Sequence, residues 1–207
     1  MATKQSSFIN MVLALFLVTL ISSAVLGLVY EATKEPIAQA NLNKKLNAIK
    51  EVVPEFTNNP DADQFKIALA EGDSVTAYPA KKDGKLVGTA IESYTMKGFS
   101  GLIKIMVGLN PDGSIHGISV LQHQETPGLG SHMSDPGFKG QFIGKDPAKF
   151  KLIVKKDGGD VDAITAATIS SRAFCDAVQR AYDAYMKSSS NQSAEATEAS
   201  VQTEGGE

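Results

Sequence analysis

The sequence has little cysteine, histidine or tryptophan, and no excess of basic charge. Of its 207 residues, one is cysteine, three are histidine and none is tryptophan. A single cysteine, Cys175, excludes a disulfide within the chain and a metal cluster held by cysteines of one chain. Because Cys175 falls inside a helical apolar pattern, we expect it to be a small core residue. The net charge of −3 gives no sign of the clustered basic face that nucleic-acid binding needs.

The histidines and glycines form no recognisable metal, hydrolase or dinucleotide site. His116, His123 and His132 lack the spacing of metal ligands, so we expect no metal site. No Gly-x-Ser-x-Gly sequence is present, which argues against a serine hydrolase. The glycines after residue 127 have the wrong spacing for a dinucleotide-binding loop, and we expect no long helix directly after them.

An apolar run from Phe8 to Tyr30 contains no charged residue and is long enough for one membrane-spanning helix. Lys4 precedes the run, and positive charge before a span favours a cytoplasmic N-terminus with the rest of the chain outside. A small-residue site at Ser22-Ser23-Ala24 leaves a cleaved signal peptide as the alternative. Since the apolar run continues past that site, we predict an uncleaved, single-pass anchor in the inner membrane over residues 1–30.

The remaining pattern predicts one α+β domain over residues 31–187, with an antiparallel sheet and flanking helices. Pro36 and four apolar residues at helical spacing, followed by Pro54, predict a juxtamembrane helix over residues 31–54. Two hairpins follow, with turns at Asp83-Gly84 and at residues 110–113. Their predicted strands are residues 75–80, 86–94, 101–109 and 114–121, and residues 150–154 form a possible further strand.

The end of the chain predicts a helix and then a polar tail. Phe174, Val178, Ala181 and Tyr185 have the spacing of one face of an amphipathic helix. Residues 188–207 are rich in serine, alanine, threonine, glutamine and glutamate and contain no basic residue. Such a segment cannot bury enough apolar surface to become ordered, so we predict a disordered acidic tail.

The stretch Asp162-Ala163-Ile164-Thr165-Ala166-Ala167-Thr168-Ile169-Ser170-Ser171 places several hydroxyls and small side chains directly before this helix. The first turn of a helix has backbone N–H groups without partners and carries partial positive charge, which suits a phosphate group. The simpler interpretation is that these serines and threonines only cap the helix.

This stretch resembles the flavinylation motif of the FMN-binding domain family, which runs Asp, two residues, Ser or Thr, Gly, Ala, Ser or Thr, one residue, Ser or Thr. The resemblance implies that Thr168 carries FMN through a phosphoester bond. It also implies roles for the neighbouring residues: Thr165, Ala166 and Ala167 around the phosphate, and Asp162 and Ser170 in recognition by a flavin transferase. Ala166 stands where the family usually has glycine, and a positive φ at this position would make alanine costly.

A second stretch, His123-Gln124-Glu125-Thr126-Pro127-Gly128-Leu129-Gly130, begins an irregular segment that continues to about Asp146. By itself it indicates a surface loop with Pro-Gly turns, although loops of this length are often functional. It also resembles the loop beside the flavin ring in the same family. That resemblance implies that Thr126 and Leu129 flank the isoalloxazine ring with Glu125 nearby. Residues 97–101 resemble the family's glycine-aromatic loop, which implies packing against the site.

Taken together, these motifs resemble the G subunits of Rnf electron-transport complexes, with the C subunit of the sodium-translocating NADH:quinone reductase as the alternative. The resemblance implies a covalent FMN carrier that relays electrons in a complex coupling ferredoxin and NAD electron transfer to sodium or proton translocation. Its implied partners are the other membrane subunits, a flavin transferase and the lipid bilayer. The chain would then be one redox subunit of a translocase and not a complete enzyme. A membrane-anchored binding or scaffold module without cofactor remains the alternative from another class.

Overall fold

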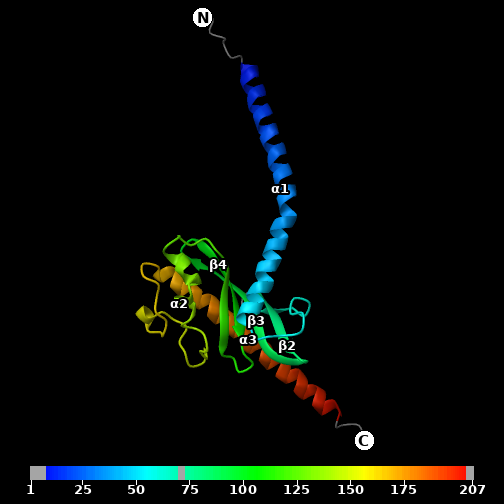
Figure 1. Ribbon diagram of the computed structural model, residues 1–207, viewed down its shortest axis with the longest axis vertical. Coiled ribbons are helices and arrows are strands. Elements are labelled where there is room, and N and C mark those ends of the chain that lie inside the picture. Colours follow the sequence, from blue (N-terminus) through cyan, green and yellow to red (C-terminus); the bar gives the residue numbers. More distant parts are fainter. Residues whose placement is uncertain (1–7, 70–72, 204–207) are drawn as a thin grey trace, which may run out of the picture. The chain divides into compact units, whose positions relative to one another are not determined.

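The computed structural model describes residues 8–69 and 73–203, and the chain divides into two compact units, Met1–Lys44 and Lys45–Glu207. The elements appear in Figure 1 in the order α1 (Phe8–Val52), β1 (Phe65–Ala68), β2 (Ser74–Lys82), β3 (Lys85–Gly98), β4 (Gly101–Leu109), β5 (Ile115–His123), η2 (Gly130–Ser134), α2 (Pro136–Lys139), η3 (Lys155–Asp157) and α3 (Thr168–Thr203). An N-terminal apolar helix followed by an antiparallel sheet with flanking helices is the predicted α+β class.

Helix α1 is continuous, whereas the sequence predicts an anchor and a separate juxtamembrane helix. Pro36 lies inside α1 and not in the first turn of a second helix. A proline removes only one backbone hydrogen bond, and the alanines, lysines and leucines around it favour helix on both sides. Within the described residues, α1 is the helix that is long and apolar enough to cross a membrane, and its apolar window is not buried. The predicted boundary at residue 30 stays a prediction.

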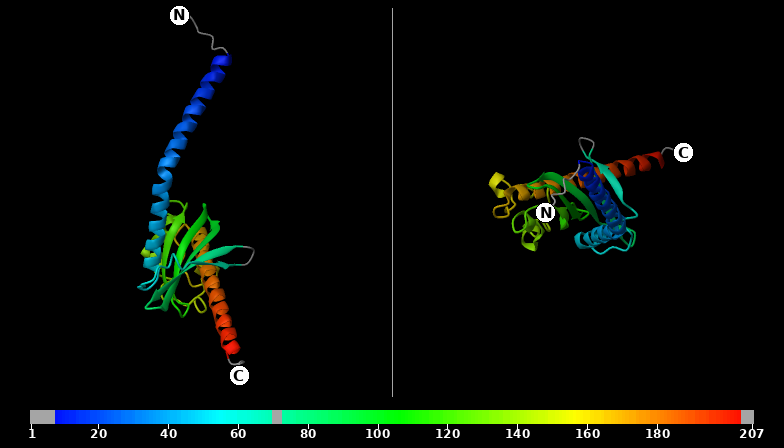
Figure 2. Two further views of the ribbon diagram at one scale, coloured as in Figure 1. Left: turned by 90° about the vertical axis from the view of Figure 1, so that its right-hand side faces the viewer. Right: turned by 90° about the horizontal axis from the view of Figure 1, so that it is seen from above.

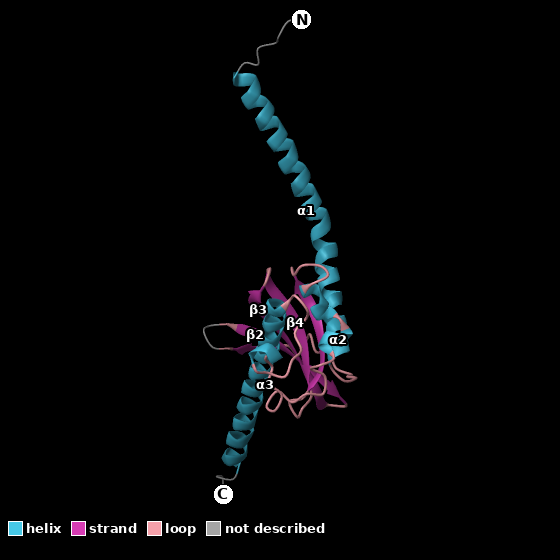
Figure 3. Cartoon of the chain, turned by 90° about the vertical axis from the view of Figure 1, so that its left-hand side faces the viewer, coloured by secondary structure: helices cyan, strands magenta, loops and turns pink. Residues whose placement is uncertain are grey.

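The sheet is antiparallel throughout, with its five strands in sequence order from β1 to β5 (Figure 3). Both predicted hairpins are confirmed. Asp83 and Gly84 have φ angles of 52° and 79°, the left-handed pair that a tight two-residue hairpin turn requires. Strand β1 has only four residues and was not predicted. The possible strand at residues 150–154 is wrong: this segment forms a single parallel bridge, Val154 to Val161, before η3 begins.

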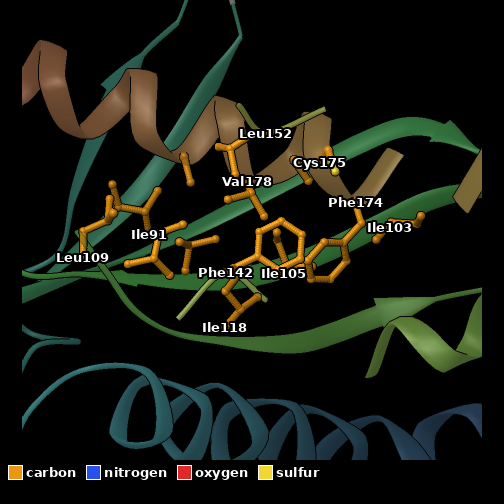
Figure 4. Packing of buried hydrophobic residues seen from close by; sticks show 14 of the residues in the cluster. Ile91, Ile103, Ile105, Leu109, Ile118, Phe142, Leu152, Phe174, Cys175 and Val178 are labelled. Atoms are coloured by element: carbon orange, nitrogen blue, oxygen red, sulfur yellow. The ribbon is translucent and has the colours of Figure 1, made fainter. Parts of the chain in front are cut away.

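One face of the sheet packs against α3 (Figure 2). Figure 4 shows side chains of α3, among them Phe174 and Val178, pointing toward the isoleucines of β3 and β4. Phe174 also packs against Phe138 and Phe142 from the segment after β5, with ring centroids 5.2 and 5.3 Å away. This core therefore fixes the start of α3 against both the sheet and that segment. Cys175 is buried in it as predicted, and burial raises its pKa to about 12.

The opposite face of the sheet packs against the last turns of α1, through Ala48, Ile49 and Val52. Strand β4 has a glycine at the point of closest approach. A Cβ atom on Gly108 would lie 1.7 Å from the backbone oxygen of Val52. Only glycine therefore allows the end of α1 to reach the sheet at this point.

Helix α3 is longer than the sequence predicts. Its predicted apolar positions are buried, and the helix then continues through the predicted tail to Thr203. Extending an existing helix needs no new nucleation, and the alanines and glutamates of this segment have high helix propensity. Disorder of residues 188–207 in solution stays a prediction, and residues 204–207 lie outside the described part of the chain.

Candidate functional site

A pocket of about 300 Å³ lies at the N-terminus of α3. It is formed by three segments: the turn between β3 and β4, the loop after β5, and the first turn of α3. Its lining residues are Phe99, Glu125, Thr126, Leu129, Gly130, Ala166, Ala167, Thr168, Ile169 and Ser170. The two stretches that the sequence analysis selected, about 40 residues apart in the chain, thus line one pocket.

Most of the residues predicted for the site line this pocket. Those from the loop are Glu125, Thr126 and Leu129, and those from the start of α3 are Ala166, Ala167, Thr168 and Ser170. Phe99, from the segment resembling a glycine-aromatic loop, also lines it. Thr165 and Asp162 do not: both are exposed in the turn that precedes α3.

The backbone turns tightly before α3 begins. The N–H of Ala167 donates to the oxygen of Ile164 at 3.0 Å, and the N–H of Ser171 donates to the oxygen of Ala167 at 3.0 Å. The Ser171 hydroxyl strengthens this turn, because it accepts from the Ile164 N–H at 2.9 Å and donates to the Ala167 oxygen at 3.0 Å. Ala166 lies at the apex with a φ of 59°. This is the left-handed conformation that favours glycine, and it gives the family's usual glycine a physical reason.

The hydroxyls near the pocket have different surroundings. Thr168, the first residue of α3, is half-buried and lines the pocket. Among the described residues, no hydrogen bond engages its hydroxyl. Ser170 and Ser171 are buried and hydrogen-bonded inside the protein. The Thr168 hydroxyl therefore has no hydrogen bond among the described residues and lies at a helix N-terminus, where backbone N–H groups can bind an anion.

The Glu125 side chain connects the three segments of the pocket. It is only 4% exposed. Its Oε2 accepts the Ser170 hydroxyl at 2.5 Å, and its Oε1 accepts the Ser100 N–H at 3.0 Å. The two oxygens of one side chain are thus each bonded to a different wall of the pocket.

The Asp162 side chain points to solvent and forms an ion pair with Lys155 at 2.7 Å. Its backbone is fixed by Gln141, whose Oε1 accepts the Asp162 N–H at 2.7 Å and whose Nε2 donates to the Asp162 oxygen at 3.2 Å. Nearby, a double hydrogen bond from Arg172 lowers the pKa of Asp157 and ties η3 to α3. The turn before α3 is therefore held firmly while the Asp162 carboxylate stays accessible.

Sequence reasoning missed two lining residues, Gly130 and Ile169. Gly130 lies at the start of η2, and Ile169 is an apolar side chain in the first turn of α3 that is 48% exposed. Phe99 and Leu129 are likewise exposed, at 67% and 40%. Ile169 could have been predicted to line the site, because it is an apolar residue between two hydroxyl residues of the motif. The pocket thus combines exposed apolar side chains with a polar helix N-terminus, which suits a ligand with a flat apolar ring and a phosphate.

Comparison with known proteins adds a family to this geometry. Residues 98–183 match the family described as the FMN-binding domain. The chain is 36% identical over 190 residues to the G subunit of the ion-translocating oxidoreductase complex of Aliivibrio fischeri, covering 86% of this chain and 88% of that relative. It is 34% identical over 185 residues to the G subunit from Vibrio cholerae, covering 84% and 87%.

A solved structure shows the same fold. The C subunit of the Na(+)-translocating NADH-quinone reductase from Parabacteroides distasonis is similar over 72% of this chain and 82% of that chain, with a TM-score of 0.50. Its sequence identity is 23%, so the likeness concerns the fold alone.

Proposed function

Because the chain belongs to the family of G subunits of ion-translocating oxidoreductase complexes, we propose that it carries FMN covalently on Thr168. The coarser function, a membrane FMN-binding subunit of such a complex, follows from the family and from helix α1. The covalent attachment, the transferase and the coupling of electron transfer to ion translocation are the parts that we propose.

The pocket fits FMN in the character of its walls. The exposed side chains of Phe99, Leu129 and Ile169 would contact the flavin ring, and the N-terminus of α3 would hold the phosphate. The volume of about 300 Å³ is at the small end of the range for ligand pockets. When bound, FMN supplies the electron-transfer chemistry, while the protein binds, orients and shields it.

One observation carries the choice of Thr168. Of the hydroxyls at the start of α3, that of Thr168 both lines the pocket and is free of hydrogen bonds within the described residues. In the proposed attachment, a bond forms between Thr168 Oγ and the phosphorus of the FMN half of FAD. The pyrophosphate bond of FAD breaks, AMP leaves, and the hydroxyl proton passes to a base of a metal-dependent flavin transferase. This accounts for a Thr168 hydroxyl that has no hydrogen-bonded base among the residues that the structure describes.

The proposed setting is the inner membrane, with the domain on its outer side. Lys4 before the apolar segment favours this orientation. A covalent bond would prevent loss of the cofactor from a domain outside the cytoplasm. The tethered flavin would pass electrons between other membrane subunits, in a complex that couples ferredoxin and NAD electron transfer to sodium or proton translocation.

The test is co-expression of the full chain with a flavin transferase, followed by fluorescence of the denatured protein band. We expect a fluorescent band from the wild type and from Thr168→Ser, which keeps a hydroxyl, and a dark band from Thr168→Ala. Ser190→Ala is the matched control for an exposed hydroxyl of the same helix outside the pocket, and its band should stay fluorescent. A fluorescent Thr168→Ala band would show that the flavin is attached elsewhere.

A further inference from the structure

We propose that the hydrogen bond between Ser170 and Glu125, here named the Glu125–Ser170 clasp, positions the Thr168 hydroxyl for flavin attachment. Ser170 is then a positioning residue inside the domain and not a surface feature that the transferase reads. The inference rests on the proposed function, since it assigns a role within the same site.

The burial of both partners separates them from solvent. The exposed fraction is 2% for Ser170 and 4% for Glu125, and their side-chain oxygens are 2.5 Å apart. A partner protein contacts only atoms that reach the surface, so the Ser170 hydroxyl is not available to it in this conformation. A short hydrogen bond to a carboxylate is also about twice as strong as one between neutral groups.

The clasp connects the first turn of α3 to the other walls of the pocket. Glu125 Oε1 accepts the N–H of Ser100 from the turn between β3 and β4, and Oε2 accepts the Ser170 hydroxyl. Thr168 lies two residues before Ser170, which is about 3 Å along the helix axis. A change in the position of this first turn would therefore move the Thr168 hydroxyl relative to the loop and the β3–β4 turn.

Two glycines leave the room that the carboxylate occupies. A Cβ atom on Gly130 would lie 2.5 Å from Ser170 Oγ and 2.7 Å from Glu125 Oε2. A Cβ atom on Gly98 would lie 2.3 Å from the backbone oxygen of Gly101 and 2.6 Å from Glu125 Oε1. Neither glycine has a positive φ, so close approach is the reason for glycine: of the two clasp side chains at Gly130, and of both the Gly101 backbone and the Glu125 carboxylate at Gly98. Gly130 and Gly98 thus both leave space for the Glu125 carboxylate, and Gly130 also leaves space for the Ser170 hydroxyl.

The test uses four variants of the full chain: Ser170→Ala, Ser170→Thr, Glu125→Gln and the double variant Ser170→Ala with Glu125→Gln. Thr keeps the hydroxyl and is allowed at this position of the family's motif, so it should rescue. The Gln side chain keeps an acceptor oxygen for the Ser100 N–H but presents an NH2 group to the Ser170 hydroxyl, so it replaces the hydrogen bond to a carboxylate by a weaker one between neutral groups. Ser190→Ala is the matched control, because Ser190 is an exposed serine on the same helix whose hydroxyl, within the described part of the chain, bonds only to the Lys187 oxygen.

The first measurement is flavin transfer under steady-state conditions, with the chain as the acceptor substrate. For Ser170→Ala and for Glu125→Gln we expect kcat to fall by about 10-fold to 100-fold, the size of effect that a displacement of about 1 Å can have. We expect KM to change by less than about 3-fold, because the surface that the transferase contacts is unchanged. The double variant should be no slower than the slower single variant, because the two changes act on the same hydrogen bond and their effects should not add. Ser170→Thr and Ser190→Ala should match the wild type.

The second measurement needs no flavin. Hydrogen exchange of the backbone amides in the first turn of α3 should be faster than in the wild type for both single variants, and unchanged for Ser190→Ala. A raised KM for Ser170→Ala with normal transfer to Glu125→Gln would overturn the proposal, since it would mean that Ser170 is read directly. Unchanged exchange in both single variants would also overturn it. If no variant accepts flavin while a control protein does, the proposed function fails, and the exchange measurement still decides whether the clasp holds the helix.

Discussion

Replacing Ala166 by glycine should stabilise the domain. Ala166 has a φ of 59° and an exposed side chain, so the substitution removes a left-handed alanine without removing buried contacts. The left-handed conformation costs an L-residue roughly 1–2 kcal/mol. Removing this cost stabilises the folded state. Glycine offsets about 0.4–1 kcal/mol of the stabilisation, because it is more flexible than alanine in the unfolded chain. The expected net gain in unfolding free energy is about 0.5–1 kcal/mol, which corresponds to a rise in Tm of about 1–4 °C.

The assay is chemical and thermal unfolding of the full chain in detergent, followed by circular dichroism. Ala148→Gly is the matched control: Ala148 is also an exposed loop alanine, but its φ is not positive, so the same substitution should destabilise by about 0.4–1 kcal/mol. The two variants should therefore change stability in opposite directions. If Ala166→Gly destabilises as much as Ala148→Gly, the left-handed conformation at residue 166 is refuted as a source of strain.

Two further predictions concern the other face of the sheet. Gly108→Ala should lower the unfolding free energy by about 3 kcal/mol in a denaturant titration, because the new Cβ atom would lie 1.7 Å from the Val52 oxygen. Gly137→Ala is the matched control: the space around Gly137 is open, so this change should alter the unfolding free energy by less than about 1 kcal/mol. Burial alone raises the pKa of Glu92, but Lys104, the Tyr78 hydroxyl and the charge of Lys45 together outweigh it, so the net shift is downward. A lowered folded-state pKa gives stability that is present at neutral pH and lost as the pH falls below about 4. Glu92→Gln should therefore lose less stability than the wild type between pH 7 and pH 3, and an equal loss in both proteins would contradict the assignment.

The parts of the fold that were predictable from the sequence depend on local patterns. Asp83-Gly84 specifies its hairpin because both residues tolerate a positive φ, and Phe174 and Val178 reveal a buried helix face by their spacing. Strand β1 was missed because four residues contain too little alternation to be recognised. The extra strand predicted around Leu152 was wrong because an apolar run shows burial but not its pairing partner, and here only Val154 forms a bridge.

The site was predictable as two motifs but not as a set of contacts. Resemblance selected Glu125 and Ser170 separately, and nothing in a linear sequence indicates that their side chains meet across 45 positions. The same limit applies to Gly130: as the glycine that leaves room for this contact, it has no signal of its own among the neighbouring glycines. The sequence indicated only that alanine would be costly at residue 166 if its φ were positive, and the structure shows that the angle is positive.

The structure also separates the two ends of the motif by their access to solvent. The Asp162 carboxylate is exposed beside Lys155, at a turn whose backbone Gln141 holds in place. Because Ser170 is buried, we propose that a transferase recognises the side chain of Asp162 and not that of Ser170. Under the proposed function, Asp162→Asn should therefore raise KM for flavin transfer, whereas Ser170→Ala should lower kcat. The fixed spacing of the motif then has a physical reason, because one short stretch must supply a surface contact, an attached hydroxyl and an internal hydrogen bond. If both variants changed the same kinetic constant, this division of roles would be wrong.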